Sequence, residues 1–210
     1  LIASEPMTIV LSQKGWIRAG KGHELDPAAL SYRDGDALLD FFRGRSTLNI
    51  AVLDNTGRSY SSLTHTLPSA RGNGEPLSGR FSPPPGAQFV GLASGETTQK
   101  FIVSSNYGYG FITSFENFLG IKKAGKQLIN TDKNASILPP CALHDAATDF
   151  VVVISSGGNL LAFPANELPE LDKGKGNKLM QIPPAKLKSG EEYITAGTCV
   201  IEGGELTLFC

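Results

Sequence analysis

The feature that most constrains the fold is a strand, glycine turn and strand that return at a nearly constant interval. The turn glycines are Gly15, Gly57, Gly108, Gly158 and Gly204, so the intervals are 42, 51, 50 and 46 residues. Glycine supplies the positive φ that tight hairpin turns need. Hairpin units repeated at this length are typical of propeller-like arrays. The sequence therefore predicts an all-β fold of about five blades, each with four antiparallel strands.

The repeat also sets the expected boundaries. We expect one domain over residues 1–210, with blades at about 5–48, 49–98, 99–148, 149–190 and 191–210. The fifth unit, which starts near Cys199, is cut short, so the last blade is expected to be incomplete. The chain begins at Leu1 without an initiator Met, which favours a fragment of a longer protein.

Composition narrows the class of protein. The formal net charge is −1 over 210 residues, so any nucleic-acid binding must come from local clusters of basic residues. No apolar run approaches the roughly 20 residues of a membrane helix, so we expect no membrane partner. The three cysteines, Cys141, Cys199 and Cys210, show no CxxC spacing and predict reduced thiols rather than a disulfide framework or a zinc site.

Glycine-rich basic strings follow three of the turns. They are 70–74, 122–126 and 173–178, and we take Gly72, Gly125 and Gly174 as equivalent positions. If these loops sit at equivalent places on successive blades, their cations line one rim, which suits a bent phosphate backbone. Glycines there let phosphates approach backbone N–H groups. The candidate DNA-binding residues are Arg18, Lys21, Arg58, Arg71, Arg80, Lys122, Lys123, Lys126, Lys173, Lys175 and Lys178.

The sequence shows no sign of catalysis. The histidines are scattered, and neither a nucleophile elbow nor a phosphate-binding P-loop is present. Tyr60, Tyr107 and Tyr109 lie in strand or turn contexts and are interpreted as blade packing. We therefore predict no catalytic residue and no metal ligand in this chain.

A second hypothesis is a protein-interaction propeller. The acidic residues gather in 26–40 and 191–205, apart from the basic loops, and could contact a partner. The near-zero net charge is its best support. A carbohydrate-binding or hydrolytic propeller is disfavoured because clustered carboxylates and aromatic platforms are missing.

Several motifs resemble one known family. They are Asp54-x-Thr-Gly-Arg-x-Tyr60, Leu67-Pro-Ser-Ala-Arg-Gly-x-Gly-Glu-Pro-Leu77, Tyr107-Gly-Tyr-Gly-Phe111 and Leu168-Pro-x-Leu-x-Lys-Gly-Lys-Gly-Asn-Lys178. Together they resemble the C-terminal domain of bacterial type IIA topoisomerase A subunits, and within that family the topoisomerase IV branch. The gyrase branch carries a Gln-Arg-Arg-Gly-Gly-Lys-Gly box, of which only partial echoes occur here, at 18–22 and 173–176.

The resemblance implies a β-pinwheel, in which neighbouring blades exchange a strand. It implies duplex binding and bending without sequence readout, so that the transported DNA segment is presented for decatenation and supercoil relaxation. The chain would not be an enzyme by itself, because the nucleophilic tyrosine lies in the N-terminal part of the A subunit. Implied partners are double-stranded DNA, a chromosome condensin, the rest of the A subunit, and the ATPase B subunit. The domain would need no cofactor, the holoenzyme would use ATP and Mg, and the location would be the bacterial cytoplasm at the nucleoid.

Overall fold

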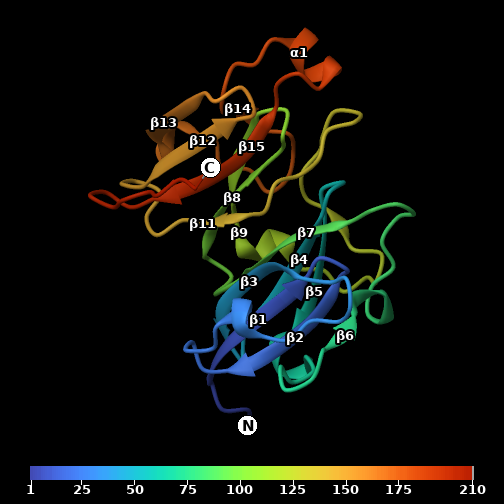
Figure 1. Ribbon diagram of the computed structural model, residues 1–210. Coiled ribbons are helices and arrows are strands. Elements are labelled where there is room, and N and C mark those ends of the chain that lie inside the picture. Colours follow the sequence, from blue (N-terminus) through green and yellow to red (C-terminus); the bar gives the residue numbers. More distant parts are fainter. Residues whose placement is uncertain (210) are drawn as a thin grey trace.

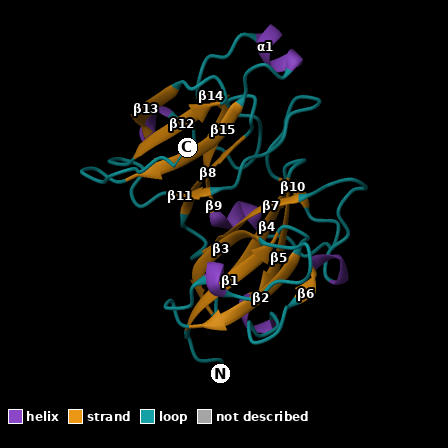
Figure 2. Cartoon of the chain, viewed as in Figure 1, coloured by secondary structure: helices purple, strands orange, loops and turns teal. Residues whose placement is uncertain are grey.

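The computed structural model describes residues 1–209, and short strands joined by loops dominate it (Figure 1). Helix is limited to brief turns (Figure 2). The 3₁₀ turns are Pro27–Ala29, Thr64–Thr66, Leu77–Gly79, Phe115–Phe118 and Ala165–Glu167, and the α-helix is α1 (Pro184–Ser189). None of the described helices is long and apolar enough to span a bilayer.

The strands form four antiparallel sheets. In spatial order, sheet 1 contains β3 (Leu38–Arg45), β1 (Pro6–Ser12), β2 (Trp16–Lys21) and β6 (Glu75–Pro76). Sheet 2 contains β10 (Lys126–Gln127), β5 (Arg58–Leu63), β4 (Asn49–Asp54) and β7 (Phe89–Ser94). Sheet 3 contains β11 (Cys141–Ala142), β8 (Lys100–Ser104), β9 (Tyr109–Ser114) and β14 (Asn177–Lys178). Sheet 4 contains β13 (Leu160–Pro164), β12 (Phe150–Ser155) and β15 (Ile194–Val200).

The predicted hairpins are confirmed for four units. Gly15, Gly57, Gly108 and Gly158 have φ of +78°, +91°, +85° and +80°, and each turn joins the two central strands of its sheet or, in sheet 4, β12 and β13. In Figure 1 the sheets follow one another from β1–β3 at the bottom to β12–β15 at the top.

The predicted fifth unit is not a separate blade in residues 1–209. Cys199 belongs to β15, which pairs with β12 as the third strand of sheet 4. The residues after Val200, including the predicted turn at Gly204, form no strand up to residue 209. A run of Thr, Cys, Val and Ile followed by glycines is typical of a new hairpin, yet here it closes the preceding sheet.

Neighbouring sheets exchange strands, as the resemblance implied. β6 follows the hairpin of sheet 2 along the chain but pairs with β2 of sheet 1. β10 follows the hairpin of sheet 3 and pairs with β5, and β14 follows that of sheet 4 and pairs with β9. Each of sheets 1 to 3 is thus completed by the segment that comes after the next hairpin.

The core lies between successive sheets. Along β4, Ile50 and Val52 pack toward sheet 1, whereas Ala51 and Leu53 pack toward sheet 3. Side chains alternate across a strand, so a strand buried on both faces must be apolar at consecutive positions. This explains why the central strands are continuous apolar runs in the sequence.

Candidate functional site

The three exchanged strands place three basic loops at equivalent positions. The loops cover residues 68–74, 119–125 and 170–176, and each leads directly into β6, β10 or β14. After each short strand a buried leucine N–H donates to a turn carbonyl of the receiving sheet. These pairs are Leu77 to Gly15 (2.8 Å), Leu128 to Gly57 (2.9 Å) and Leu179 to Gly108 (2.7 Å).

A glycine ends each loop for a steric reason. Gly74, Gly125 and Gly176 have φ of +86°, +67° and +81°. An added Cβ would lie 2.3, 2.7 and 2.0 Å from the carbonyl oxygens of Ile17, Ser59 and Gly110, respectively. These three glycines are therefore the equivalent positions. The sequence match through Gly72 and Gly174 was wrong by two residues, because glycines alternate with other residues in both strings.

Asp54 organises the turn that opens sheet 2. Its buried Oδ1 accepts hydrogen bonds from the N–H of Thr56 (2.9 Å), the hydroxyl of Thr56 (2.6 Å) and the N–H of Arg58 (3.1 Å). Its Oδ2 accepts the hydroxyl of Tyr60 at 2.6 Å. Burial and this hydrogen bond raise the pKa of Tyr60. The Asp-x-Thr-Gly-Arg-x-Tyr motif is thus one hydrogen-bonded unit, and Tyr60 packs in the core as predicted.

Arg58 holds the second basic loop. Its Nε donates to the carbonyl of Ala124 (2.9 Å) and its Nη2 to that of Gly125 (3.2 Å). Beside it lies a hollow of about 590 Å³ lined by Gly120, Lys122 and Lys126. Arg58 therefore positions the loop more than it offers a free charge.

Six of the predicted cations are available on these loops and the strands they enter. Within residues 1–209, no salt bridge involves any of the six. All are exposed except Lys126, which is half-buried. They are Arg71, Lys122, Lys123, Lys126, Lys173 and Lys178.

Two of the predicted DNA-binding arginines are already engaged by other groups of the fold. Arg18 is only 4% exposed, donates to the carbonyls of Gly72 and Ser31 (2.7 Å each), and lies 4.8 Å from the ring centroid of Tyr32. Arg80 pairs with Glu75 and also donates to Ser62 and Thr66. Because a guanidinium has five donors in a fixed fork, it is well suited to gather carbonyls, and both side chains are already engaged in this way.

Lys21 and Lys175 are engaged at the surface. Lys21 pairs with Glu5 at 3.1 Å, and it lines a hollow of about 580 Å³ together with Arg71. Lys175 pairs with Asp132 at 2.9 Å, and its Nζ lies 4.1 Å from the ring centroid of Tyr109. Exposed ion pairs of this kind exchange readily with solvent, so neither lysine is removed from a phosphate's reach.

A hollow of about 530 Å³ adjoins the third loop and was not expected. It is lined by Tyr107, Tyr109 and Lys175 together with Leu187 and Lys188 of α1. The two tyrosines were interpreted as blade packing, but both are only half-buried and face this hollow. No sequence signal pointed to it, because its walls come from segments far apart in the chain.

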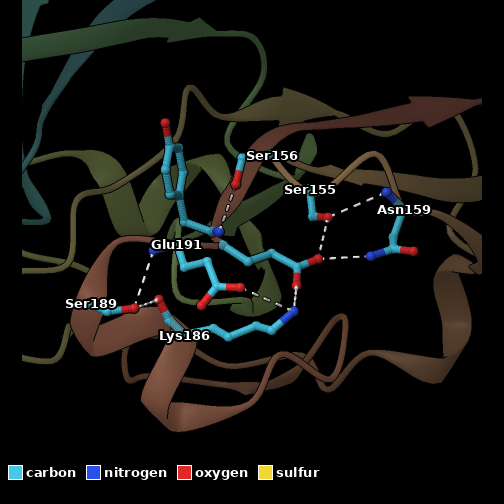
Figure 3. A network of polar contacts seen from close by, with 8 residues as sticks. Ser155, Ser156, Asn159, Lys186, Ser189 and Glu191 are labelled. Atoms are coloured by element: carbon cyan, nitrogen blue, oxygen red, sulfur yellow. Dashed lines mark hydrogen bonds and ion pairs between the residues drawn. The ribbon is translucent and has the colours of Figure 1, made fainter.

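The acidic residues near the C-terminal end are partly structural. Glu192 accepts hydrogen bonds from Ser155 and Asn159 (2.7 Å each) at the β12–β13 turn. Figure 3 labels Ser155 and Asn159 within the network of polar contacts. Lys186 of α1 lies 3.6 Å from the carboxylates of both Glu191 and Glu192. The hydrogen bond from Ser155, followed by that from Asn159, lowers the pKa of Glu192. This network ties the loop after α1 to sheet 4.

Possible metal ligands are dispersed. No cluster of three or more His, Cys, Asp or Glu side chains that could hold an ion occurs in the part of the chain that the structure describes. The three loops carry Lys and Arg side chains, which suit anionic ligands, but the N–H groups of Gly72, Gly125 and Gly174 already donate to backbone carbonyls.

Comparison with known proteins identifies relatives. The family model described as DNA gyrase C-terminal domain, beta-propeller, matches residues 99–138 and 149–200. The A subunit of DNA topoisomerase 4 from Pseudomonas aeruginosa is 42% identical over 99% of this chain and 28% of its own length. The same subunit from Escherichia coli K12 is 43% identical over 91% of this chain and 25% of its own. The chain thus spans about a quarter of the length of these relatives.

Solved structures agree. The E. coli ParC C-terminal domain superposes with a TM-score of 0.84 at 42% identity, over 95% of this chain and 81% of that one. A second structure, the C-terminal domain of DNA topoisomerase IV, gives a TM-score of 0.74 at 15% identity, over 95% of this chain and 62% of that one, which supports the fold alone.

Proposed function

Because this chain belongs to the family of C-terminal domains of topoisomerase IV A subunits, we propose that it binds duplex DNA and bends it without reading its sequence. The observation that carries the proposal is the repetition, on three loops beside exchanged strands, of cations that make no ion pair within residues 1–209. Cations spaced along successive sheets suit a phosphate backbone that curves past them.

Energetics set the expected strength of binding. Bending a short duplex costs on the order of 1 to 6 kcal/mol, which several phosphate contacts must offset. Each contact contributes about −0.9 to the log–log slope of affinity against salt. Six cations are available, and a single duplex contacts only some of them at once. We therefore expect a slope of about −3 to −5. Phosphate contacts position a duplex but carry no base information, so affinity should vary little with sequence.

The proposal extends to a role within the larger enzyme, and membership of the family supports it. The domain presents the transported DNA segment to the cleavage core, which supports decatenation and supercoil relaxation. The nucleophilic tyrosine then belongs to the rest of the A subunit, whereas ATP and Mg belong to the holoenzyme with its B subunit. The chain's match to only about a quarter of its relatives supports this division of labour. Tight wrapping is not proposed, because the gyrase-type basic box is incomplete in this sequence.

A matched pair of double variants tests the proposal. Lys122→Glu with Lys123→Glu should weaken duplex binding and make the salt slope shallower by about 1.8, since two contacts are lost. Lys14→Glu with Lys188→Glu changes net charge equally but lies outside the three loops, and should affect binding far less. Fluorescence anisotropy across a salt series measures both. Equal losses in the two variants, or a slope near zero for the unmodified protein, would contradict the proposal.

The alternative of a protein-interaction surface makes a different prediction. It expects a partner, of which a chromosome condensin is one candidate, to bind through the acidic segments 26–40 and 191–205. Binding would then survive nuclease treatment and the loop reversals, and would be lost when those acidic segments are neutralised.

A further inference from the structure

Two cysteines far apart in the sequence meet where sheets 3 and 4 adjoin. Cys141 lies on β11, the edge strand of sheet 3, and Cys199 on β15, the edge strand of sheet 4. The backbone N–H of Cys199 donates to the Sγ of Cys141 at 3.1 Å. The Sγ of Cys199 lies 3.9 Å from the carbonyl oxygen of Cys141. Each thiol therefore touches the other residue's backbone, across a sequence separation of 58.

We propose that Cys141 and Cys199 form a reversible disulfide, made by a peroxide and broken by a thiol reductant, that links sheets 3 and 4. Both cysteines are free and partly exposed, so a small oxidant can reach them. The surrounding crevice is tight, with about 10 Å³ of free volume and walls that include Pro139 and Thr198. These contacts hold the two residues side by side, as a disulfide between them requires.

The environment divides the two chemical roles. Through a hydrogen bond with the Cys199 thiol, the pKa of Cys141 is lowered below its ordinary value. The same hydrogen bond, together with burial, raises the pKa of Cys199. The hydrogen bonds agree: the Sγ of Cys141 accepts the Cys199 N–H, which favours a thiolate, whereas the Sγ of Cys199 donates to a carbonyl oxygen. Because the thiolate is the reactive form, Cys141 is the attacking group and Cys199 the resolving one.

The reaction balances in two steps. The Cys141 thiolate attacks one oxygen of hydrogen peroxide, the O–O bond breaks, and hydroxide leaves, which yields a sulfenic acid. The Cys199 sulfur then attacks the Cys141 sulfur, the S–O bond breaks, and the hydroxyl departs with the Cys199 proton as water. The two thiols lose two electrons in total, and these reduce the peroxide.

The Cys141–Cys199 disulfide would add a covalent link between sheets 3 and 4. Among the described residues, sheets 3 and 4 are also joined by the β14 exchange and by a shared apolar cluster. A covalent link at β11 and β15 adds a further attachment, so the oxidised protein should resist unfolding. For a loop of this length, the expected rise in Tm is roughly 5 to 15 °C.

Peptide mapping of the intact protein provides the direct test, since it needs no variant. After treatment with hydrogen peroxide, mass spectrometry under non-reducing conditions should find a Cys141–Cys199 cross-linked peptide, and dithiothreitol should remove it. The Tm of the oxidised sample should rise and should return on reduction. Finding both cysteines still reduced, or either one linked instead to Cys210 or to a second molecule, would overturn the proposal.

Two variants test the order of the steps. Cys199→Ser leaves Cys141 without its resolving partner, so a sulfenic acid at residue 141 should be trapped by dimedone. Cys141→Ser should give no dimedone adduct at residue 199. An adduct at Cys199 in the second variant, with none at Cys141 in the first, would contradict the assignment of Cys141 as the attacking thiol.

Discussion

At the scale of single residues, the family motif is held together by one buried carboxylate. Asp54 receives four hydrogen bonds, three at Oδ1 and one at Oδ2, and all come from residues within its own turn and the strand that follows. A buried carboxylate is tolerated only when its oxygens are satisfied. The residues of the motif therefore depend on one another, and Arg58 and Gly57 within it also fix the loop that carries Lys122.

Removing the Tyr60 hydroxyl tests this dependence. Tyr60→Phe leaves Oδ2 of Asp54 buried without its partner, so the free energy of unfolding should fall by about 1–3 kcal/mol. Tyr107→Phe is a matched control, because that ring is half-buried beside a hollow and should change stability by less than about 0.5 kcal/mol. Urea denaturation of both variants gives the comparison. Equal stabilities would show that the Asp54 network is dispensable.

At the scale of elements, three two-residue strands connect each sheet to the next one along the chain. β6, β10 and β14 are too short to be found by hydrophobic alternation, because that pattern needs about four residues to register. The glycine before each strand and the leucine after it are the recognisable signals. Sequence reasoning found the glycine-rich strings but misaligned two of them, and it assigned no structural role to Leu77, Leu128 and Leu179.

Gly176→Ala tests the steric role of the loop glycine. Its Cβ would lie 2.0 Å from the carbonyl oxygen of Gly110, and the positive φ adds strain, so we expect a loss of about 2 kcal/mol or more. Gly158→Ala is the control, since its φ of +80° is similar but an added Cβ meets nothing within 4 Å. Hydrogen exchange at the Leu179 amide should quicken in the first variant only. Unchanged protection there would mean that β14 tolerates a side chain at this position.

The Glu192 network, which ties the loop after α1 to sheet 4, should weaken as the pH falls. The pKa of Glu192 lies below its ordinary value of 4.5 when folded, so ionisation stabilises the native state. That contribution is present above the unfolded value and is lost as pH falls through the lower, folded value. Glu192→Gln should therefore destabilise the protein at neutral pH, and the difference from the unmodified protein should shrink in acid. Thermal unfolding across pH measures it, with the more exposed Glu191→Gln as control.

At the scale of the whole molecule, the hairpin repeat could be predicted from the sequence, but the contacts between distant segments could not. Turn glycines and apolar runs predicted the all-β class and five hairpins, because both follow from local φ requirements and side-chain alternation. Four of the five hairpins are confirmed. What remained hidden depends on contacts across the chain. Arg18 resembled a surface cation but collects the carbonyls of Gly72 and Ser31, and Cys199 resembled the start of a new unit but completes sheet 4.

Contacts between distant residues also limited the prediction of the candidate site. Sequence reasoning located the six cations that make no ion pair among residues 1–209, since Lys and Arg among glycines in a loop are recognisable without a structure. It could not separate them from Arg58 and Arg80, because the sequence does not show whether an arginine binds backbone carbonyls or faces solvent. Burial and hydrogen-bond partners made that distinction.

The strand exchange has a consequence for how such a chain can be lengthened or cut. Repeats in the sequence and sheets in space are out of phase, since each of the first three sheets borrows its last strand from the segment beyond the next hairpin. Severing the chain between two repeats, for example after residue 98, would remove β10 and strip sheet 2 of an edge. Within residues 1–209, β13 pairs on one side only, and its Leu160 and Leu161 are exposed there. Deleting one sequence repeat would therefore remove a strand from the neighbouring sheet as well as the sheet that the repeat itself forms.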